Sequence, residues 1–295
     1  MLAFRLPTFW HLRTRSLSLP HPGGSLRRPL FMGIVNVTPD SFSDGGRHDS
    51  VEAAVAHGMR LVAEGADILD VGGESTRPFS SPVDLDEEVR RVSDVVERLA
   101  GEAGVPVSID TSKALVASRA LELGAEIIND VTGLEGDPDM LRVARESGAG
   151  ICAMHMQGTP QTMQIAPHYD DVVAEIHAYL AARRDALVAS GIPLGKICLD
   201  PGIGFGKTHA HNRELMAHAR DFLDLGTPIL VGHSRKGFIG KALEQSLGRP
   251  PTRDELDAGT AAAACDLAAQ GTQIIRVHAV GTVRAAFDSS ATMRP

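Results

Sequence analysis

Short apolar runs alternate with longer segments of helical periodicity along most of this chain, and this alternation constrains the fold more than any other feature. The eight runs are FMGIVNV, ADILDVG, VPVSID, AEIIND, AGICAMH, KICLDPG, TPILVG and TQIIRVH. Val, Ile and Leu runs that are joined through helices indicate a parallel sheet covered on both faces. Eight such units in about 260 residues predict an α/β protein with one domain, a (β/α)8 TIM barrel.

Local signals mark where the helices begin and end. Asp84 with Glu87, and Thr252 with Glu255, have the spacing of a capping box at a helix start. Glycines occupy the places where helices should stop: Gly65, Gly124, Gly148, Gly191 and Gly271. Because no linker divides the alternating region, residues 29–295 are expected to form the barrel, and residues 1–28 an N-terminal extension or hairpin.

The beginning of the chain also has a weak resemblance to an organelle transit peptide, because arginines alternate there with serine and apolar residues. Pro7, Pro20, Pro22 and the pair Gly23-Gly24 interrupt any amphipathic helix. A strand or hairpin that leads into the core is therefore favoured over a targeting segment.

Composition excludes several classes of protein. The 295 residues carry a net charge of -8, which argues against nucleic acid or an anionic membrane as the main partner. No run of about eighteen apolar residues occurs, so no membrane-spanning helix is expected. Cys152, Cys198 and Cys265 lie in scattered apolar contexts, which is typical of reduced core residues and of a cytoplasmic protein.

Polar residues end most of the apolar runs. They are Asn36, the segment GGESTRP after Asp70, Asp110, Asn129 with Asp130, Met154 with His155, Asp200, Ser234-Arg235-Lys236, and Arg276 with His278. A single Asp or Asn at a strand end is most often a cap or turn former. In a barrel, however, all these ends converge on the face where active sites are built, so the set predicts a site there.

Two apparent motifs are rejected. The stretch PGIGFGKT resembles a phosphate-binding loop, but Pro201 and Lys207 stand where the two possible patterns require glycine. Its glycines are expected to let the backbone pass close to a flat ligand, with Lys207 facing solvent. The histidines His209, His211 and His218 form no metal-binding pattern and are expected to lie on a polar helix face.

Taken together, the motifs resemble those of the dihydropteroate synthase family. The matching segments are GIVNVTPDSFSDGG, DVGGESTRP, SIDT, IINDVTG, MHMQGTP, LDPGIGFGK, GHSRKGFIG and IIRVH. They occur in the order of the family and span residues 31 to 280, nearly the whole predicted barrel. The resemblance implies a transferase of folate biosynthesis, which joins 7,8-dihydropterin-6-ylmethyl diphosphate to p-aminobenzoate and releases 7,8-dihydropteroate and diphosphate.

The resemblance also implies a set of residues for the pterin. A buried carboxylate at Asp200 would accept from adjacent N–H groups of the ring, and a carboxylate at Asp110 would stabilise positive charge that develops on it. Asp110 and Lys236 are the residues assigned to catalysis. The full pterin-binding set is Asp110, Asn129, Met154, Asp200, Phe205 and Lys236.

The other substrate groups are assigned in the same way. Asn36, Arg276 and His278 are expected to bind diphosphate, with Asn36 also a ligand of Mg²⁺; for the last two, a surface arginine and a core histidine are the alternative. The residues expected at the p-aminobenzoate site and its lid loops are Phe42, Asp44, Ser75, Thr76, Arg77, Pro78 and Gly237. Phe42 could instead be a loop anchor. Gly237 departs from the family, which often has Ser or Thr there.

Two other functions remain open from the sequence. A pterin-dependent methyltransferase of related design would need neither the NVTPDSFSDGG segment nor the SRK segment. A catalytically silent, pterin-binding paralogue would be expected to lack some of Asn36, Arg77, Lys236, Arg276 and His278, and all five are present. The family resemblance further implies a homodimer.

Overall fold

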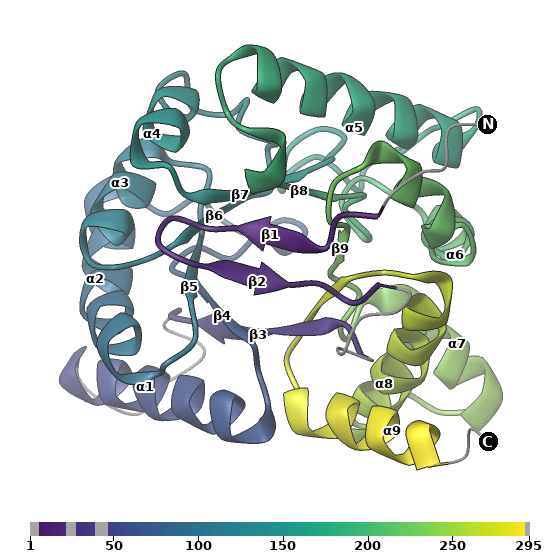
Figure 1. Cartoon of the computed structure of the whole chain (residues 1–295). Coiled ribbons are helices and arrows are strands. Elements are labelled where there is room, and N and C mark those ends of the chain that lie inside the picture. The colour runs from purple at the N-terminus through teal and green to yellow at the C-terminus, as the bar shows by residue number, and fades with distance from the viewer. Residues whose placement is uncertain (1–5, 22–27, 39–46, 293–295) are drawn as a thin grey trace.

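Eight parallel strands form the centre of the molecule (Figure 1). The structure is a computed structural model that describes residues 6–21, 28–38 and 47–292 of the chain. The barrel strands are β3 (Leu30–Asn36), β4 (Ile68–Gly72), β5 (Val107–Asp110), β6 (Ile127–Asp130), β7 (Gly150–Met154), β8 (Ile197–Asp200), β9 (Leu230–Val231) and β10 (Ile274–Val277). They coincide with the eight apolar runs, so the predicted barrel is confirmed.

The strands pair in the order β8-β7-β6-β5-β4-β3-β10-β9. A parallel bridge between Leu199 and Ile229 joins the two ends of this sheet and closes it. The amide of Leu199 also donates to the carbonyl of Pro228 at 3.0 Å. Closure matters for function because it brings the carboxyl ends of all eight strands around one mouth.

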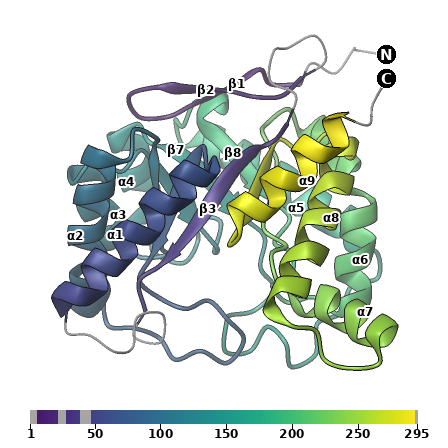
Figure 2. The ribbon, with the colours of Figure 1, turned by 90° about the horizontal axis from the view of Figure 1, so that it is seen from below.

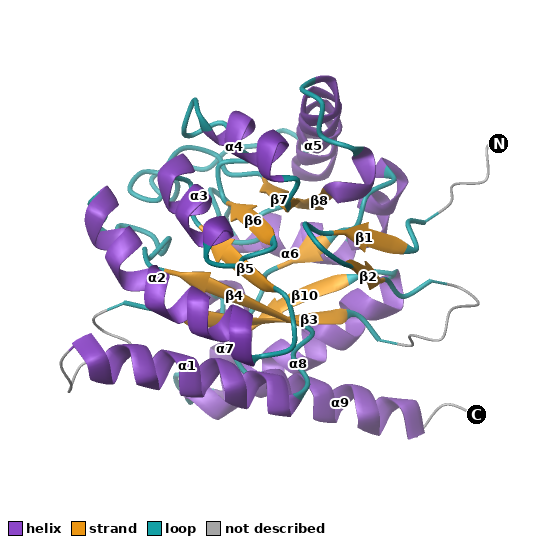
Figure 3. Cartoon of the chain, turned by 60° about the vertical axis from the view of Figure 1, so that its left-hand side comes forward, coloured by secondary structure: helices purple, strands orange, loops and turns teal. Residues whose placement is uncertain are grey.

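Helices surround the sheet (Figure 3). They are α1 (Arg47–Glu64), α2 (Leu85–Glu102), α3 (Ala114–Glu122), α4 (Met140–Ser147), α5 (Val172–Ala189), α6 (His209–Ala217), α7 (Gly237–Leu247), α8 (Arg253–Gln270) and α9 (Val280–Thr292), with short 3-10 helices η2 (Leu194–Lys196) and η3 (Ala219–Leu225). Along the described part of the chain, no helix has the length and apolarity needed to span a lipid bilayer.

Helix ends follow the sequence signals. Thr252 and Glu255 form the predicted capping box of α8, and all five glycines that were expected to end helices have positive φ. The helix start predicted at Asp84 is confirmed, because Asp84 is the N-cap of α2, but its side chain makes no cap hydrogen bond. Its expected partner Glu87 instead accepts from Arg91 at 2.8 Å and also pairs with Arg90.

Side chains of the strands alternate between two layers. Outward residues such as Phe31, Leu69 and Ile128 pack against the helices. The inward residues at the amino end of the barrel form a separate apolar cluster: Leu30, Met32, Ile68, Ile127, Cys152, Cys198, Leu230 and Ile274. Further along most of these strands the inward positions become polar. The two-residue period of a strand therefore sends each of these polar groups into the mouth of the barrel.

An antiparallel hairpin covers the amino end of the barrel (Figure 2). It consists of β1 (Phe9–His11) and β2 (Ser16–Ser18). Trp10 is fully buried against the inward cluster, and its indole Nε1 donates to the carbonyl of Lys196 at 2.9 Å. The hairpin thus closes the end of the barrel opposite the polar strand ends.

Candidate active site

The inward polar residues at the carboxyl ends of the strands lie side by side in the barrel. Strand pairing sets Asp110 beside both Gly72 and Asn129, and Met154 beside Asp200. Gly72 and Gly232 have no side chain, so the side chains on the strands beside them can approach one another. A Cβ at Gly232 would lie 3.8 Å from Cβ of Arg276 and 4.0 Å from Oδ2 of Asp200. These strand-end residues therefore form one candidate site.

Arg276 is the centre of the charge network in this site. Its Nε donates to Oδ2 of Asp70 at 2.6 Å, and a terminal guanidinium nitrogen donates to Oδ2 of Asp110 at 2.7 Å. Asn129 also donates to Oδ2 of Asp70, at 3.1 Å. Burial opposes the charge on Arg276, but Asp70 and Asp110 raise its pKa above the ordinary value. Oδ1 of Asp70 is buried and has no partner among the described residues.

Burial changes the proton affinity of Asp110. It raises the pKa of this carboxyl to about 7, even though Arg276 acts in the opposite direction. The negative charge of Asp70 adds to the increase. A titratable carboxyl at a strand end, next to a fixed cation, is typical of active sites.

Asp200 and Lys236 face each other from two neighbouring parts of the barrel. Oδ1 of Asp200 accepts from the amide of Gly202 at 2.7 Å. Burial lowers the pKa of Lys236 to about 7, and Asp200 acts against that decrease. The ammonium of Lys236 donates to the carbonyl of Ile203 and lies 4.4 Å from the ring centroid of Phe205. An aromatic ring, a cation and a carboxylate thus meet where a flat, polar heterocycle could bind.

Lys207 contradicts the expectation that it faces solvent. It is buried, with 1% of the residue exposed, and its Nζ lies 3.0 Å from Nδ1 of His155. The sequence could not show this, because one partner of Lys207, His155, follows a different strand, β7. The expected polar face of α6 is confirmed: His209 and His218 are exposed, and His211 takes part in the capping box of that helix.

His278 lies at the positive side of the site. Its Nδ1 is 2.9 Å from Oγ of Ser234, which also accepts from the backbone amide of His278 at 3.2 Å. Burial lowers the pKa of His278 to about 3, and the charges of Arg235, Arg276 and Arg77 lower it further. A neutral imidazole in a positive field can donate to an anion without adding a charge of its own.

The loop after β4 contains four of the predicted residues. Ser75 and Thr76 are half-buried, whereas Arg77 and Pro78 are exposed. The ammonium of Lys113 pairs with Glu74 at the base of this loop. At the far end of the loop, the amide of Phe79 donates to the carbonyl of Pro160 at 3.0 Å. Phe42 and Asp44 lie outside the described residues.

Gly237 begins α7 at the edge of the site. A Cβ at this position would meet only the ring of His209, at 3.5 Å and 3.7 Å. Arg235, next in the chain to Lys236, binds Asp257 with two hydrogen bonds of 2.5 Å and 2.8 Å. This pairing gives Arg235 a structural role.

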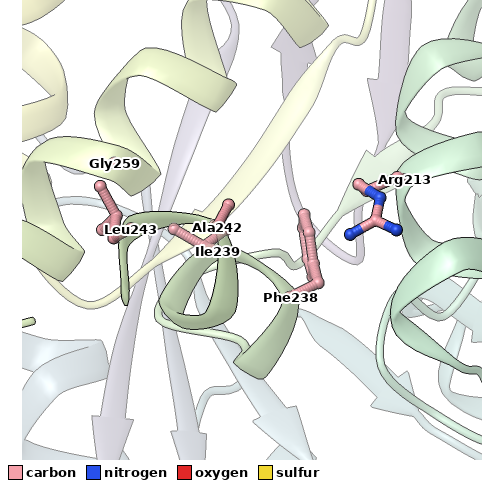
Figure 4. A pocket seen from close by; sticks show the side chains of 6 residues that line it. All are labelled: Arg213, Phe238, Ile239, Ala242, Leu243 and Gly259. Atoms are coloured by element: carbon pink, nitrogen blue, oxygen red, sulfur yellow. The ribbon is translucent and has the colours of Figure 1, made fainter. Parts of the chain in front are cut away.

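An apolar cavity of about 340 Å³ lies behind this helix start (Figure 4). Its walls come from three helices and comprise Arg213, Phe238, Ile239, Ala242, Leu243 and Gly259. Because its lining has none of the strand-end carboxylates and amides, this cavity is distinct from the candidate active site.

Few side chains near the strand ends could bind a metal ion. The described residues contain no cluster of three or more His, Cys, Asp or Glu side chains that could hold an ion. Asn36, the last residue of β3, is half-buried and is paired with Gly72. Such a site fits only an ion that takes most of its oxygen ligands from substrate and water, as Mg²⁺ commonly does.

Sequence reasoning missed three residues of this arrangement. Asp70 was treated only as the residue before a loop, although a charged residue inside an apolar strand is an available signal. Ser234 was not assigned, and no local pattern distinguishes it from other strand-end serines. Lys207 was assigned to the wrong environment.

Comparison with known proteins agrees with this geometry. Residues 32–278 match the profile of the pterin binding enzymes. The dihydropteroate synthase of Escherichia coli is 47% identical over 255 residues, which cover 86% of this chain and 88% of that protein. The chain belongs to the dihydropteroate synthase family. The family membership confirms the predicted resemblance and the predicted class of enzyme, a transferase.

Solved structures of the dihydropteroate synthase family extend the agreement to the fold. A Xanthomonas albilineans enzyme with 4-aminobenzoic acid has a TM-score of 0.86 and 44% identity, covering 98% of this chain and 99% of its own. A structure of the same enzyme in complex with 7,8-dihydropteroate has a TM-score of 0.82 and 42% identity, covering 97% and 100% of the two chains. Both support the single barrel and favour the synthase over a methyltransferase.

Proposed function

We propose that this chain condenses 7,8-dihydropterin-6-ylmethyl diphosphate with p-aminobenzoate, and that the strand-end residues carry out the reaction. The bond between the methylene carbon and the diphosphate oxygen breaks, and the amine nitrogen forms a bond to that carbon and loses a proton. The products are 7,8-dihydropteroate and diphosphate. The relatives named dihydropteroate synthase, and the neighbours with 4-aminobenzoic acid or 7,8-dihydropteroate, support this reaction.

The pterin ring is assigned to the barrel mouth between Asp200 and Asp110. Asp200 would accept two N–H groups of the guanidine-like edge of the ring, and Asn129 can offer both a donor and an acceptor. Lys236 would leave the carbonyl of Ile203 to bind the carbonyl oxygen of the ring. Lys236, whose ammonium lies 4.4 Å from the ring centroid of Phe205, would supply a cation beside the pterin ring. Phe205 and the buried Met154 would supply apolar surface for its two faces.

Asp110 is assigned to the developing positive charge of the pterin. When the carbon–oxygen bond weakens, a carboxylate fixed 2.7 Å from Arg276 needs no rearrangement to stabilise that charge. The adjacent Arg276 is also available to the departing diphosphate, which would compete with the two carboxylates for its guanidinium.

The diphosphate is assigned to Asn36, Arg276 and His278. Mg²⁺, when bound by the diphosphate and Asn36, would neutralise charge on the leaving group. The positive field of Arg77, Arg235 and Arg276 around the neutral His278 supports an anion site there.

The aryl amine is assigned to the rim of the barrel. Ser75, Thr76, Arg77 and Pro78 would line one side, and the amide of Gly237 at the start of α7 would bind the carboxylate. Phe42 and Asp44 are proposed to complete this site from the first loop. Exclusion of water by these loops would protect a cationic pterin from hydrolysis.

We also infer that the enzyme works as a homodimer in the cytoplasm. The resemblance to the family is the basis for the dimer. The buried thiols Cys152 and Cys198, which are not joined by a disulfide, agree with a reducing compartment.

The observation that supports the proposal most directly is the network of Arg276 with Asp70 and Asp110, next to Asp200 and Lys236. The test measures dihydropteroate and diphosphate formed from the two substrates with magnesium. Wild-type activity that is lost in Lys236→Ala and in Asp110→Asn would support these roles. The exposed lysine variant Lys241→Ala is the matched control and should keep full activity. Pterin binding without product in the wild type would instead indicate the silent paralogue.

A further inference from the structure

One buried cation takes no part in the proposed chemistry. Lys207 ends the loop between β8 and α6, and its three contacts are all uncharged. Nζ lies 2.9 Å from the carbonyl oxygen of Phe205, 3.0 Å from Nδ1 of His155 and 3.5 Å from the carbonyl oxygen of His155. A lysine enclosed in this way is costly unless it serves a purpose, because burial disfavours its charged form.

The contacts can satisfy an ammonium at Lys207. All three partners accept hydrogen bonds, and an ammonium has three protons to donate, whereas a neutral amine has only two. Burial lowers the pKa of His155 to about 3, so its imidazole stays neutral. In the tautomer with the ring proton on Nε2, Nδ1 accepts from Lys207. Burial also lowers the pKa of Lys207 well below its usual range, while Asp200 acts in the opposite direction.

The loop that Lys207 fastens forms part of the proposed pterin site. It contains Phe205, whose ring lies under Lys236, and Ile203, whose carbonyl binds the same lysine. The loop also lies directly on the backbone after β7. A Cβ added at Gly202 would lie only 1.9 Å from the carbonyl oxygen of His155, so no larger residue fits.

A second hydrogen bond anchors the same loop. The hydroxyl of Tyr169 donates to the carbonyl of Gly206 at 3.0 Å. The ring of Tyr169 lies 6.1 Å from that of His155. This bond gives a comparison for Lys207, because it holds the loop without any charge.

We propose that Lys207 is a positioning residue for the pterin, behind the site rather than in contact with the ligand. Its ammonium ties the loop that includes Ile203 and Phe205 to His155, and its positive charge favours the ionised form of Asp200. This inference rests on the proposed function, because it takes the pterin as the ligand of Asp200.

Several charged groups surround Asp200, and each contributes to its titration. Lys236 acts from the segment between β9 and α7, Arg276 acts from β10, and Lys207 acts from the loop that follows Asp200 itself. Cys152 lies on the neighbouring strand β7, where Asp200 acts on its thiol. Arg276 also connects this group to Asp70 and Asp110. Removal of Lys207 alone therefore measures the contribution of Lys207 to the pKa of Asp200, because the other charged groups are unchanged.

The test is calorimetric binding of a pterin that lacks the diphosphate, measured between about pH 5 and pH 8 with full-length protein. We expect Lys207→Met to bind about tenfold more weakly at neutral pH. Loss of the ammonium should raise the pKa of Asp200, so affinity should begin to fall at a pH roughly one unit higher than in the wild type. Lys207→Gln, which is neutral but can still donate, is the second variant if the methionine variant does not fold.

Two controls separate charge from packing. Lys196 lies at the other end of β8, where its ammonium donates to the carbonyls of Leu12 and Gly148. Lys196→Met should leave pterin affinity and its pH dependence unchanged. Tyr169→Phe should weaken binding by a similar factor at every pH, because it loosens the loop but keeps the charge.

Wild-type affinity at every pH in Lys207→Met or Lys207→Gln would overturn the inference. An equal loss of pterin affinity at every pH would also overturn the inference if the pH at which affinity begins to fall stays the same. Packing alone would then explain the effect. If the wild type binds no pterin, the proposed function fails, and this result is distinct from an effect confined to the Lys207 variants.

Discussion

Asp70 is the residue on which the proposed pterin site most depends for its arrangement. It is fully buried, and its Oδ2 accepts from both Arg276 and Asn129. Asp70→Asn leaves a buried guanidinium with one carboxylate in place of two. We expect the free energy of unfolding to fall by roughly 3 kcal/mol, measured by urea denaturation, and the KM for the pterin diphosphate to rise about tenfold.

The matched control for this prediction is Asp67→Asn. Asp67 binds Arg28 at 2.6 Å, but each side chain is 24% exposed, and the pair lies at the amino end of β3. This change should cost less than about 1 kcal/mol and leave both KM values unchanged. Equal effects from the two variants would contradict a special role for Asp70.

Gly237 offers a second prediction for a single residue. Because its Cβ would make only ordinary contacts with His209, a serine fits here without strain. Gly237→Ser adds a hydroxyl at the start of α7, so the KM for p-aminobenzoate should fall about threefold while that for the pterin stays constant. Steady-state kinetics with Gly237→Ala as control test this, since alanine adds volume without a donor. A KM that is equal in all three proteins would place the carboxylate elsewhere.

At the level of elements, the hairpin β1–β2 is expected to unfold together with the barrel. Trp10 is the only tryptophan of the chain and is buried in the cluster that fills the amino end. Its fluorescence and the far-ultraviolet circular dichroism should therefore show one coincident transition in denaturant. Trp10→Ala should reduce the free energy of unfolding by about 3–5 kcal/mol without altering either KM.

Phe9 provides the comparison within the same hairpin. It is 49% exposed, so Phe9→Ala should change the free energy of unfolding by less than about 0.5 kcal/mol. A separate early transition in tryptophan fluorescence would show that the hairpin unfolds independently of the barrel.

For the whole molecule, buried histidines determine part of the acid sensitivity. Burial lowers the pKa of His233 to about 4, from an ordinary value of 6.5. Between these values the unfolded chain binds a proton that the folded protein does not, so stability decreases as pH falls from about 6.5 to about 4. Asp110 and Asp130 act in the opposite direction, because burial raises their pKa values to about 7 and about 6.

The variant His233→Asn separates the contribution of His233 to acid sensitivity from those of Asp110 and Asp130. The slope of unfolding free energy against pH should become smaller by about 1.4 kcal/mol per pH unit, equal to one proton. His168→Asn, at a largely exposed position, is the control and should keep the wild-type slope. Equal slopes in the wild type and His233→Asn would show that His233 has the same pKa in the folded and the unfolded chain.

Much of the fold and part of the candidate site were predictable because they depend on local patterns. The eight apolar runs specify strands, and the two-residue period places Asp110, Asn129 and Asp200 inward at the strand ends. At Asp84 the helix begins as its sequence pattern predicts, but the capping box does not form, and Glu87 binds Arg90 and Arg91 on the same helix instead. A local signal decides the structure only where no neighbour competes for the same atoms.

The sequence by itself determined the order of strands and helices, the barrel class and which residues stand at the carboxyl ends of the strands. Only the tertiary structure decided which of those residues meet. Arg276 and Asp70 are separated by 206 positions in the chain, and Lys207 and His155 by 52. Closure of the barrel brings such pairs together, and burial then sets their proton affinities, since desolvation depends on every element packed around a group.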